Sequence, residues 1–332
     1  MSAEILEVLK RGGFLAEGAE ARLEPLTGGV SSDVFRLETP TGVYCVKRAL
    51  PQLRVAADWR APVERSHFEV EWLRVSQAYA GGAIPEVLFE DRASNLFVMN
   101  FFPPDKHSVW KADLAAGDVD VGFAESVGRL LAALHAGAAG SAAVAARFDT
   151  TPLFEDLRLG PFLRHCAEAH PDLAARLVRL ADRTAATRIT LVHGDVSPKN
   201  ILHGPAGPVL LDAECAWYGD PAFDLAFCSA HLLLKSVWRP PHIAAYLAAF
   251  TALQRGYLAR VTWEDAAALE ARAAELTAAV LLARVDGKSP ADYLRSDDDR
   301  GFVRAASRRL VADTPPTMTG LAAAWRDDLG AR

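Results

Sequence analysis

Residues 191–201 read LVHGDVSPKNI, and this stretch decides how the whole 332-residue chain is interpreted. An apolar strand delivers Asp195 into a loop, and an amide follows at Asn200. A second apolar segment, 209–211, then ends at Asp212. Phosphoryl transfer from a magnesium nucleotide needs a carboxylate that accepts or orients the attacking hydroxyl, and oxygen ligands that hold Mg²⁺ against the phosphates. Asp195 suits the first role, and Asn200 with Asp212 suits the second.

The order H-G-D-x-x-x-x-N followed by D-x-E resembles the aminoglycoside phosphotransferase and choline kinase family, which shares the protein-kinase-like fold. By that resemblance Asp195 is the catalytic base, and Asn200 and Asp212 bind magnesium. Glu214 matches the D-x-E variant of the motif, which implies contact with a second metal ion. The resemblance therefore implies an ATP- and Mg²⁺-dependent kinase.

Two further residues are expected to support this loop. The segment WYGDPAFDLA, residues 217–226, matches the family's G-D-P-x-x-D-L-A stretch, in which Asp224 resembles a residue that braces the catalytic loop. For His193, a bracing role is favoured over proton transfer, because Asp195 already fills the base role. Lys199 either contacts phosphate or belongs to an exposed loop, and the sequence leaves both readings open.

The nucleotide is expected in the first hundred residues. The segment LTGGVSSDVF, residues 26–35, places a glycine turn between two strands, where backbone N–H groups can approach phosphates. The candidate contacts in this turn are Gly28, Gly29, Ser31 and Ser32. Lys47 ends the apolar strand at 43–47, from which its ammonium can reach the α- and β-phosphates. The alternative is a strand-end lysine that extends into water.

An anion is needed to position Lys47. The helix predicted over 63–79 offers three glutamates, Glu64, Glu69 and Glu71. The family's E-x-x-x-L pattern selects Glu69, whereas helical geometry alone does not distinguish the three.

Adenine is expected at a hinge further along the chain. The segment LFVMNFFPP, residues 96–104, resembles the family's hinge, where backbone groups after the methionine bind the base. The candidate contacts are therefore Met99, Asn100 and Phe102. Asn100 stands where an acid is common in the family, but backbone contacts do not depend on that side chain.

The element order predicts an α+β, two-lobed, protein-kinase-like fold. Strand patterns surround the helix at 63–79 in the order β-β-β-α-β-β, and alanine-rich helical patterns dominate after Pro103 and Pro104. We therefore expect an N-terminal nucleotide-binding lobe over 1–102 and a catalytic and substrate-binding helical lobe over 103–332.

Composition excludes several other classes. The chain has 36 basic and 42 acidic residues, and the net charge of −6 is spread evenly, which argues against a nucleic-acid partner. The apolar runs are well short of the roughly 20 residues that a membrane span needs. The start of the chain lacks the basic and apolar regions of a signal peptide, so a cytoplasmic location is expected. Four widely spaced cysteines are typical of reduced, buried thiols.

The acceptor is the least constrained part of the prediction. The residues that could line its pocket are Trp110, Lys111, His231, Lys235 and Trp238, although each also fits ordinary surface or core packing. Their mixture of aromatic and basic groups suits a neutral or anionic hydroxylated molecule better than an aminoglycoside polycation.

The function expected is transfer of the γ-phosphoryl group of ATP to a hydroxyl of a small metabolite or drug. The sequence does not distinguish ATP from GTP, and it names neither the acceptor nor the oligomeric state. An antibiotic phosphotransferase of the aminoglycoside type is the first alternative. A protein kinase is disfavoured, because only eleven residues separate Asp212 from Asp224 and no A-P-E motif follows. A non-catalytic nucleotide-binding protein should have lost at least one of the motif residues, yet all are present.

Overall fold

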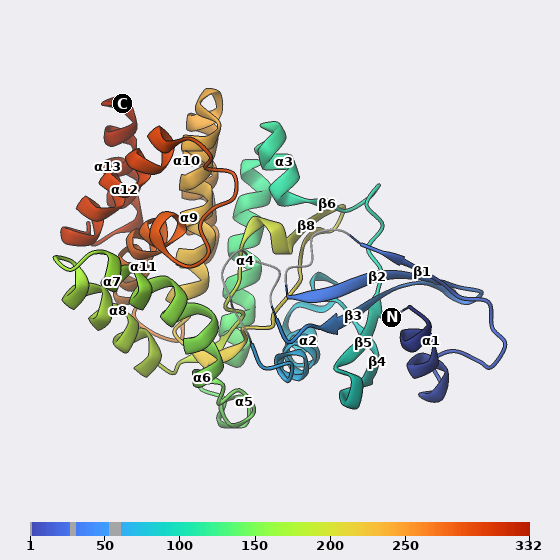
Figure 1. Cartoon of the computed structure of the whole chain (residues 1–332). Helices are drawn as coiled ribbons and strands as arrows, with labels where there is room; N and C mark the ends of the chain where they lie inside the picture. The colour runs from blue at the N-terminus through green and yellow to red at the C-terminus, as the bar shows by residue number, and fades with distance from the viewer. Residues whose placement is uncertain (1, 27–30, 53–60) are drawn as a thin grey trace. The chain divides into compact units, whose positions relative to one another are not determined.

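The computed structural model describes residues 2–26, 31–52 and 61–332. It divides into two compact units, Met1–Lys106 and His107–Arg332, hereafter unit 1 and unit 2. Unit 1 is rich in strands and unit 2 is mainly helical, which confirms the α+β class (Figure 1).

Unit 1 is built on one five-stranded antiparallel sheet in the order β1-β2-β3-β5-β4. Its strands are β1 (Arg22–Pro25), β2 (Ser32–Thr39), β3 (Gly42–Ala49), β4 (Val87–Asp91) and β5 (Leu96–Asn100). Its helices are α1 (Ser2–Arg11) and α2 (Arg65–Ala80), with short 3₁₀ turns η1 (Gly81–Ala83) and η2 (Arg92–Ser94). The β2–β3 hairpin turns between Thr39 and Gly42, which are paired at its end.

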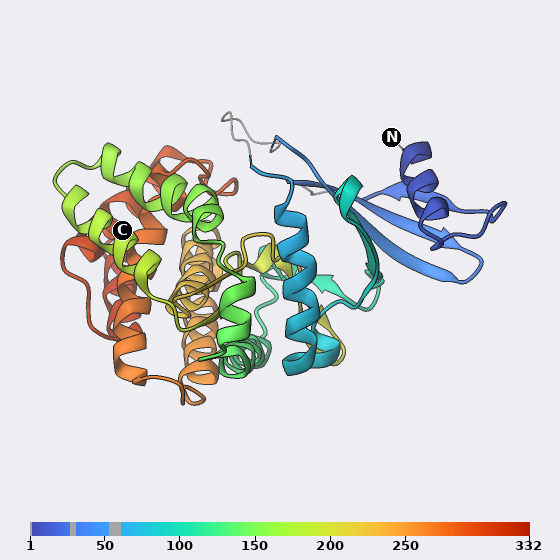
Figure 2. The ribbon, with the colours of Figure 1, turned by 90° about the horizontal axis from the view of Figure 1, so that it is seen from below.

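Helices α1 and α2 cover opposite faces of this sheet. Val46 of β3 is fully buried in the cluster that contains Ile5 and Leu9 of α1. The next residue, Lys47, contacts Glu69 of α2. Because successive strand residues point to opposite faces, the two helices lie on different sides of the sheet (Figure 2).

Unit 2 consists of helices with two small sheets, in the orders β10-β7 and β6-β8-β9. Its strands are β6 (Ser108–Val109), β7 (Thr190–Val192), β8 (Ile201–Gly204), β9 (Gly207–Leu210) and β10 (Trp217–Gly219). Its helices up to β7 are α3 (Trp110–Ala116), α4 (Val121–Ala138), α5 (Ala142–Arg147), α6 (Thr151–Phe154), the π-helix η3 (Glu155–Arg164), α7 (His165–Ala169) and α8 (Ala174–Ala186). The later helices are η4 (Pro198–Asn200), α9 (Ala222–Trp238), η5 (Pro240–His242), α10 (Ile243–Leu258), α11 (Ala266–Asp286), α12 (Asp297–Ala312) and α13 (Met318–Gly330).

Helices α4 and α10 approach each other closely through two glycines. A Cβ placed on Gly128 would lie 2.2 Å from the carbonyl oxygen of Leu253, and one on Gly256 would lie 2.3 Å from that of Glu125. Both distances are shorter than any real contact, so only glycine permits this backbone separation. The pair fixes α4 beside α10, and nearly every side chain of α9 is buried within the same unit.

All four cysteine thiols are free and buried. Burial raises the pKa of Cys45 and of Cys166 to about 12, and it raises the pKa values of Cys215 and Cys228 further. The thiols are therefore protonated and enclosed at neutral pH.

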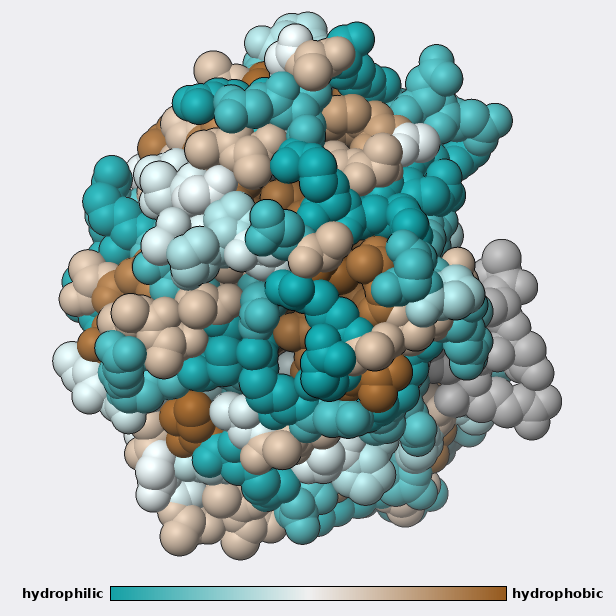
Figure 3. All heavy atoms as spheres, turned by 90° about the vertical axis from the view of Figure 1, so that its left-hand side faces the viewer, coloured by the Kyte–Doolittle hydropathy of each residue, from teal (hydrophilic) through white to brown (hydrophobic). Residues whose placement is uncertain are grey.

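Within the described ranges, no helix is long and apolar enough to cross a membrane. The face of unit 2 shown in Figure 3 mixes hydrophilic residues with small hydrophobic areas. Most large apolar side chains of the long helices are buried, as expected for a packed helical unit.

Candidate active site

The H-G-D segment begins where β7 ends. Strand β7 pairs with β10, so that Val192 lies opposite Trp217, and the chain leaves the ladder at His193. Gly194 adopts φ +80°, and a Cβ on it would lie 2.6 Å from the carbonyl oxygen of Cys215. Glycine is therefore required at the centre of the motif for both its backbone conformation and this close approach.

Asp224, at the start of α9, holds the segment in place. Its side chain is fully buried, and its two carboxylate oxygens accept hydrogen bonds from the backbone N–H groups of His193 and Gly194, each at 2.8 Å. His135 of α4 lies 3.2 Å from the same carboxylate and 2.7 Å from the hydroxyl of Tyr257. This carboxylate therefore links the loop to α4 and α9.

His193 itself lies in a bracing position. Its Nδ1 accepts a hydrogen bond from the backbone N–H of Asp195 at 3.2 Å, and its Nε2 lies 3.0 Å from the carbonyl oxygen of Leu211. Burial lowers the pKa of His193, although Asp224 and Asp195 oppose that shift. A neutral imidazole with its proton on Nε2 satisfies both contacts.

Three groups converge on the carboxylate of Asp195, which is only 4% exposed. Its Oδ2 atom lies 2.9 Å from Nδ2 of Asn200, 3.1 Å from Nη2 of Arg158 and 3.1 Å from Nζ of Lys199. Burial by itself would raise the pKa of Asp195, but the two cations outweigh it and lower the pKa. The carboxylate is therefore ionised and oriented at neutral pH.

Arg158 is the functional candidate that the sequence reasoning missed. It lies on the π-helix η3, where its Nε donates to the carbonyl oxygen of Gly194 at 2.6 Å. Charge from Asp195 contributes to a raised pKa of Arg158, despite the burial that opposes it. The H-G-D motif gives no spacing from which this arginine could be predicted, because Arg158 precedes the motif by more than thirty residues.

Asn200 and Asp212 lie at the same end of the β8–β9 hairpin. Ile201 pairs with Leu210, and the backbone N–H of Leu211 donates to the carbonyl oxygen of Asn200 at 2.9 Å. Asp212 is the next residue, and its backbone has φ +69°, a conformation that residues other than glycine rarely adopt. Strain of this kind is concentrated at functional sites.

This donor set fits Mg²⁺. The amide nitrogen of Asn200 donates hydrogen bonds to Asp195, so its Oδ1 atom can bind a metal ion. Asp212 adds a carboxylate ligand. Glu214 is buried nearby, and its charge acts on Arg158. The described ranges contain no group of three or more His, Cys, Asp or Glu side chains arranged to hold a metal. A two-ligand site agrees with Mg²⁺, which is usually held by one or two carboxylates together with substrate phosphates.

In unit 1 the described residues include the lysine–glutamate pair. Nζ of Lys47 lies 2.8 Å from both carboxylate oxygens of Glu69. Lys47 is 5% exposed and Glu69 is 2% exposed. Strand β3 continues to Ala49, so Lys47 lies within the strand and not at its end as expected. Because Lys47 and Glu69 are both buried, the pair joins the sheet to α2. Lys47 therefore does not extend into water.

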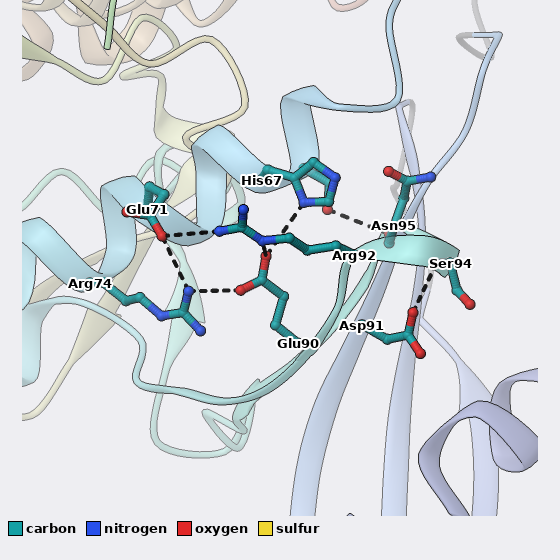
Figure 4. A network of polar contacts seen from close by, with 9 residues as sticks. His67, Glu71, Arg74, Glu90, Asp91, Arg92, Ser94 and Asn95 are labelled. Carbon is teal, nitrogen blue, oxygen red and sulfur yellow. Dashed lines mark hydrogen bonds and ion pairs between the residues drawn. The ribbon is translucent and has the colours of Figure 1, made fainter. Parts of the chain in front are cut away.

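Glu71, another of the three glutamates considered, lies in a different network. It pairs with Arg74 at 3.2 Å and with Arg92 at 3.5 Å, and Glu90 pairs with the same two arginines (Figure 4). Glu64 precedes the first turn of α2. The helix thus directs Glu69 and Glu71 to different sides.

Of the predicted glycine turn, Gly28 and Gly29 lie outside the described residues. Ser31 and Ser32 are both buried, and Ser32 begins β2. Arg65, fully buried, donates from Nη2 to the carbonyl oxygens of Ser31 at 2.5 Å and of Leu50 at 2.7 Å. The sequence reasoning missed this arginine, which fixes the backbone at Ser31 to the end of β3.

The predicted hinge follows β5. Met99 is buried and lies opposite Cys45 in the ladder. Asn100 is half-buried, and its Oδ1 accepts a hydrogen bond from the backbone N–H of Glu86 at 2.7 Å. Phe102 lies just beyond the strand, so its backbone groups are not used by the ladder.

Of the five residues expected to line an acceptor pocket, four lie around one point in unit 2. Nζ of Lys235 lies 5.1 Å from the ring centroid of Trp238 and 4.4 Å from that of Tyr293. Lys111 lies 5.8 Å from the same tyrosine ring, and Nδ1 of His231 lies 3.2 Å from its hydroxyl. Tyr293 was not foreseen.

Trp110, the fifth, lies in the core instead. It is 1% exposed and packs edge-on against Phe123 of α4, at 5.4 Å between ring centroids. Phe123 in turn stacks on His203 of β8. Trp110 therefore joins α3 to α4 and β8.

Comparisons with known proteins bear on the family and the fold. The sequence profile of the Phosphotransferase enzyme family (APH) matches residues 22–269, most of the chain. Methylthioribose kinase of Escherichia coli O45:K1 (strain S88 / ExPEC) is 26% identical over 250 residues. That match covers 67% of this chain and 59% of the relative, so the chain matches about three fifths of the length of this curated protein.

Solved structures share the fold. A choline/ethanolamine kinase family protein from Mesorhizobium loti superimposes with a TM-score of 0.53 at 18% identity, covering 98% of this chain and 99% of that one. An amicoumacin kinase in complex with AMP-PNP, Ca²⁺ and Ami gives 0.57 at 17% identity, covering 96% and 98%. These likenesses confirm the predicted kinase-like fold. With the family profile matched over residues that include both the H-G-D loop and Lys47, the chain belongs to the Phosphotransferase enzyme family.

Proposed function

We propose that this chain is a small-molecule kinase that transfers the γ-phosphoryl group of ATP to a hydroxyl group of a small metabolite or drug. The observation that carries the proposal is the buried carboxylate of Asp195, kept ionised by Arg158 and Lys199. Family membership supports phosphoryl transfer, and the relatives named methylthioribose kinases support a small metabolite as acceptor. The even charge distribution supports an enzyme without a nucleic-acid partner.

Asp195 would orient the acceptor and take its proton. Its carboxylate accepts the hydroxyl hydrogen while the hydroxyl oxygen attacks the γ-phosphorus. The new O–P bond forms as the bond to the β,γ-bridging oxygen breaks, the proton passes to Asp195, and ADP leaves. Because its pKa is low, the carboxylate of Asp195 is a weak base and mainly orients the hydroxyl group. It takes the proton only as the O–P bond forms and the hydroxyl becomes more acidic. This order of events suits phosphoryl transfer, in which the protein contributes mostly by positioning the reactants.

Asn200 and Asp212 would hold Mg²⁺, with Glu214 beside a second ion. When bound, the metal would neutralise charge on the transferred phosphoryl group. The role of this chain is to present one neutral amide and one or two carboxylates, which limits negative charge near the polyanionic phosphates.

Unit 1 would supply the nucleotide contacts. Lys47, held by Glu69, would bind the α- and β-phosphates. The turn that contains Gly28, Gly29, Ser31 and Ser32 would contact phosphates through its backbone. Met99, Asn100 and Phe102 would bind adenine through backbone groups. The complex of a structural neighbour with AMP-PNP supports ATP as the donor.

The test compares Asp195→Asn with the exposed-site control Asp118→Asn. ADP release is measured across a panel of amino alcohols, sugars, hydroxy acids and antibiotics, and MgATP binding is measured separately by thermal shift. We expect Asp195→Asn to bind MgATP as the wild type does but to lose turnover by about 10²- to 10⁴-fold, because the amide keeps the shape and loses the charge. Turnover close to that of the wild type would overturn the assignment of Asp195.

A further inference from the structure

Nζ of Lys235, on α9, is buried and has no hydrogen-bond partner among the described residues. The residue is 1% exposed, and its Nζ atom faces the rings of Trp238 and Tyr293. Aromatic faces attract a cation but accept none of its three N–H groups in the way that an oxygen does. A buried donor left in this state is costly to the folded protein, so a ligand that supplies oxygen atoms would relieve the cost.

The charges around Lys235 are mostly of its own sign. Lys111 of α3, Arg239 just after α9, and Arg284 of α11 all act on it as cations, whereas Asp292 is the carboxylate that acts on it. Asp292 is already 3.0 Å from Nζ of Lys111. The site therefore has an excess of positive charge.

Arg284 adds a second donor to the same site. Its Nε atom is also buried without a hydrogen-bond partner in the described part of the chain, while its Nη1 donates to Ser289. Asp195 and Arg158 are among the charges that act on Arg284. Lys199 likewise acts on His231, one turn before Lys235 on α9. The two donors thus lie within electrostatic range of the H-G-D loop.

Residues 287–296, between α11 and α12, cover Lys235. Tyr293 places its ring 4.4 Å from Nζ, and Asp292 is tied to Lys111. The same segment lines a cavity of about 440 Å³ together with Val285 and Arg300. Because Nζ has no exposed area here, a ligand would reach it as this segment shifts, and the cavity leaves room for such a shift.

We propose that Lys235 and Arg284 form an anion-binding subsite for the phosphoryl acceptor. The acceptor is then a hydroxylated compound that carries a carboxylate or phosphate group, with its apolar part against Trp238 and Tyr293. The inference rests on the proposed kinase function, since it assigns the acceptor class for the same site.

Protonation of Lys235 agrees with this assignment. Burial, followed by the charge of Lys111, lowers the pKa of Lys235 to about 7, with Asp292 opposing. An anion beside the ammonium would raise that pKa again. Binding at pH 8 should therefore take up about one proton per ligand, and a purely structural lysine would give no such uptake.

The binding experiment uses probes that share a ring and differ in head group: benzoate, phenyl phosphate and the uncharged benzamide. Calorimetry at pH 8, in buffers of different ionisation enthalpy, measures affinity and proton uptake. We expect one or both anions to bind about 10- to 100-fold more tightly than benzamide, with proton uptake. Preference for one anion identifies the acceptor's head group as carboxylate or phosphate. Equal binding of benzamide, or binding without proton uptake, overturns the inference on the wild-type protein alone.

Matched variants localise the effect. Lys235→Met removes the charge at similar length, and Lys288→Met makes the same change at an exposed position of the covering segment. Anion binding should be lost in Lys235→Met and kept in Lys288→Met, and its persistence in Lys235→Met contradicts the assignment.

Turnover separates this inference from the proposed function. ADP release is compared for glycerate and its amide, for glycerol 3-phosphate and glycerol, and for kanamycin. A preference for the anionic members that Lys235→Met abolishes supports the subsite. Turnover that favours the amide, glycerol or kanamycin refutes the proposed anion-binding subsite but not the proposed kinase function. Absence of both MgATP binding and ADP release refutes the kinase function itself, and with it the acceptor role of the subsite.

Discussion

Replacing Lys235 with methionine should stabilise the folded protein, and the gain should depend on pH. In the unfolded chain this lysine has an ordinary pKa of 10.5, whereas in the folded protein burial and neighbouring cations lower it to about 7. Between these values the unfolded chain binds the extra proton, so this lysine destabilises the fold most below pH 7. The destabilisation fades as the pH rises towards 10.5.

The structure sets the size of the effect. The interval from 10.5 to about 7, at about 1.36 kcal/mol per pH unit, gives an upper limit of about 5 kcal/mol. Lys235→Met should therefore raise the free energy of unfolding at pH 6 by up to about 5 kcal/mol. That advantage should shrink by about 1.4 kcal/mol for each pH unit between 7 and 10.5.

Urea denaturation followed by circular dichroism at pH values from 6 to 10 measures this difference. Lys288→Met serves as the control, because its side chain is exposed and the same change there should leave stability within about 0.5 kcal/mol of the wild type. The reasoning is refuted if Lys235→Met is less stable than the wild type at pH 6, or if its advantage does not change between pH 7 and 10.

Three further outcomes are expected. Gly256→Ala should lower the free energy of unfolding by about 1–3 kcal/mol, because its Cβ would meet the carbonyl oxygen of Glu125 at 2.3 Å. Urea denaturation measures this, and Gly330→Ala, where the added Cβ meets nothing within 4 Å, should show no loss. Asp212→Ala should raise the Mg²⁺ concentration needed for half-maximal ADP release, since a carboxylate ligand is lost; an unchanged requirement contradicts the metal assignment. Lys47→Met should raise the KM for ATP in steady-state assays, and an unaltered KM would show that this lysine does not bind phosphate.

The H-G-D loop could be anticipated from sequence because its parts are close in the chain. Asp195 and Asn200 are separated by a single short loop, and β8 and β9 then return the backbone to Asp212. Spacing of this kind translates directly into geometry. The choice of Glu69 instead came from a family pattern, because the periodicity of α2 alone does not show which glutamate faces β3.

Arg158 and Arg65 could not be found in the same way. Arg158, with Gly160 and Pro161, lies between the helical patterns at 123–135 and 172–186, in a stretch for which the sequence pattern predicts no helix. The structure places them in a π-helix, in which the backbone N–H of His165 donates to the carbonyl oxygen of Gly160. The wider turn accommodates the proline. Arg158 supports the H-G-D loop through its tertiary contacts with Gly194 and Asp195, which the local sequence does not indicate.

Helix ends were predictable only to within a few residues, and at α11 a capping side chain sets the start. The sequence pattern over 263–284 is helical, whereas α11 begins at Ala266, because Asp265 accepts hydrogen bonds from the backbone N–H groups of Ala267 and Ala268. Trp110 illustrates the opposite limit. It was a candidate for the acceptor pocket, but the packing of α3 on α4 directs it inward.

The buried thiols can be used to measure local unfolding of this protein. Cys45 lies in unit 1, and Cys166, Cys215 and Cys228 lie in unit 2. An alkylating reagent modifies a thiol of this kind only during the moments when the surrounding structure opens. Timed labelling followed by peptide mass spectrometry would therefore record the opening rate of each unit separately, with no added probe. Ligands that bind one unit should slow labelling in that unit first, which would show where each substrate binds.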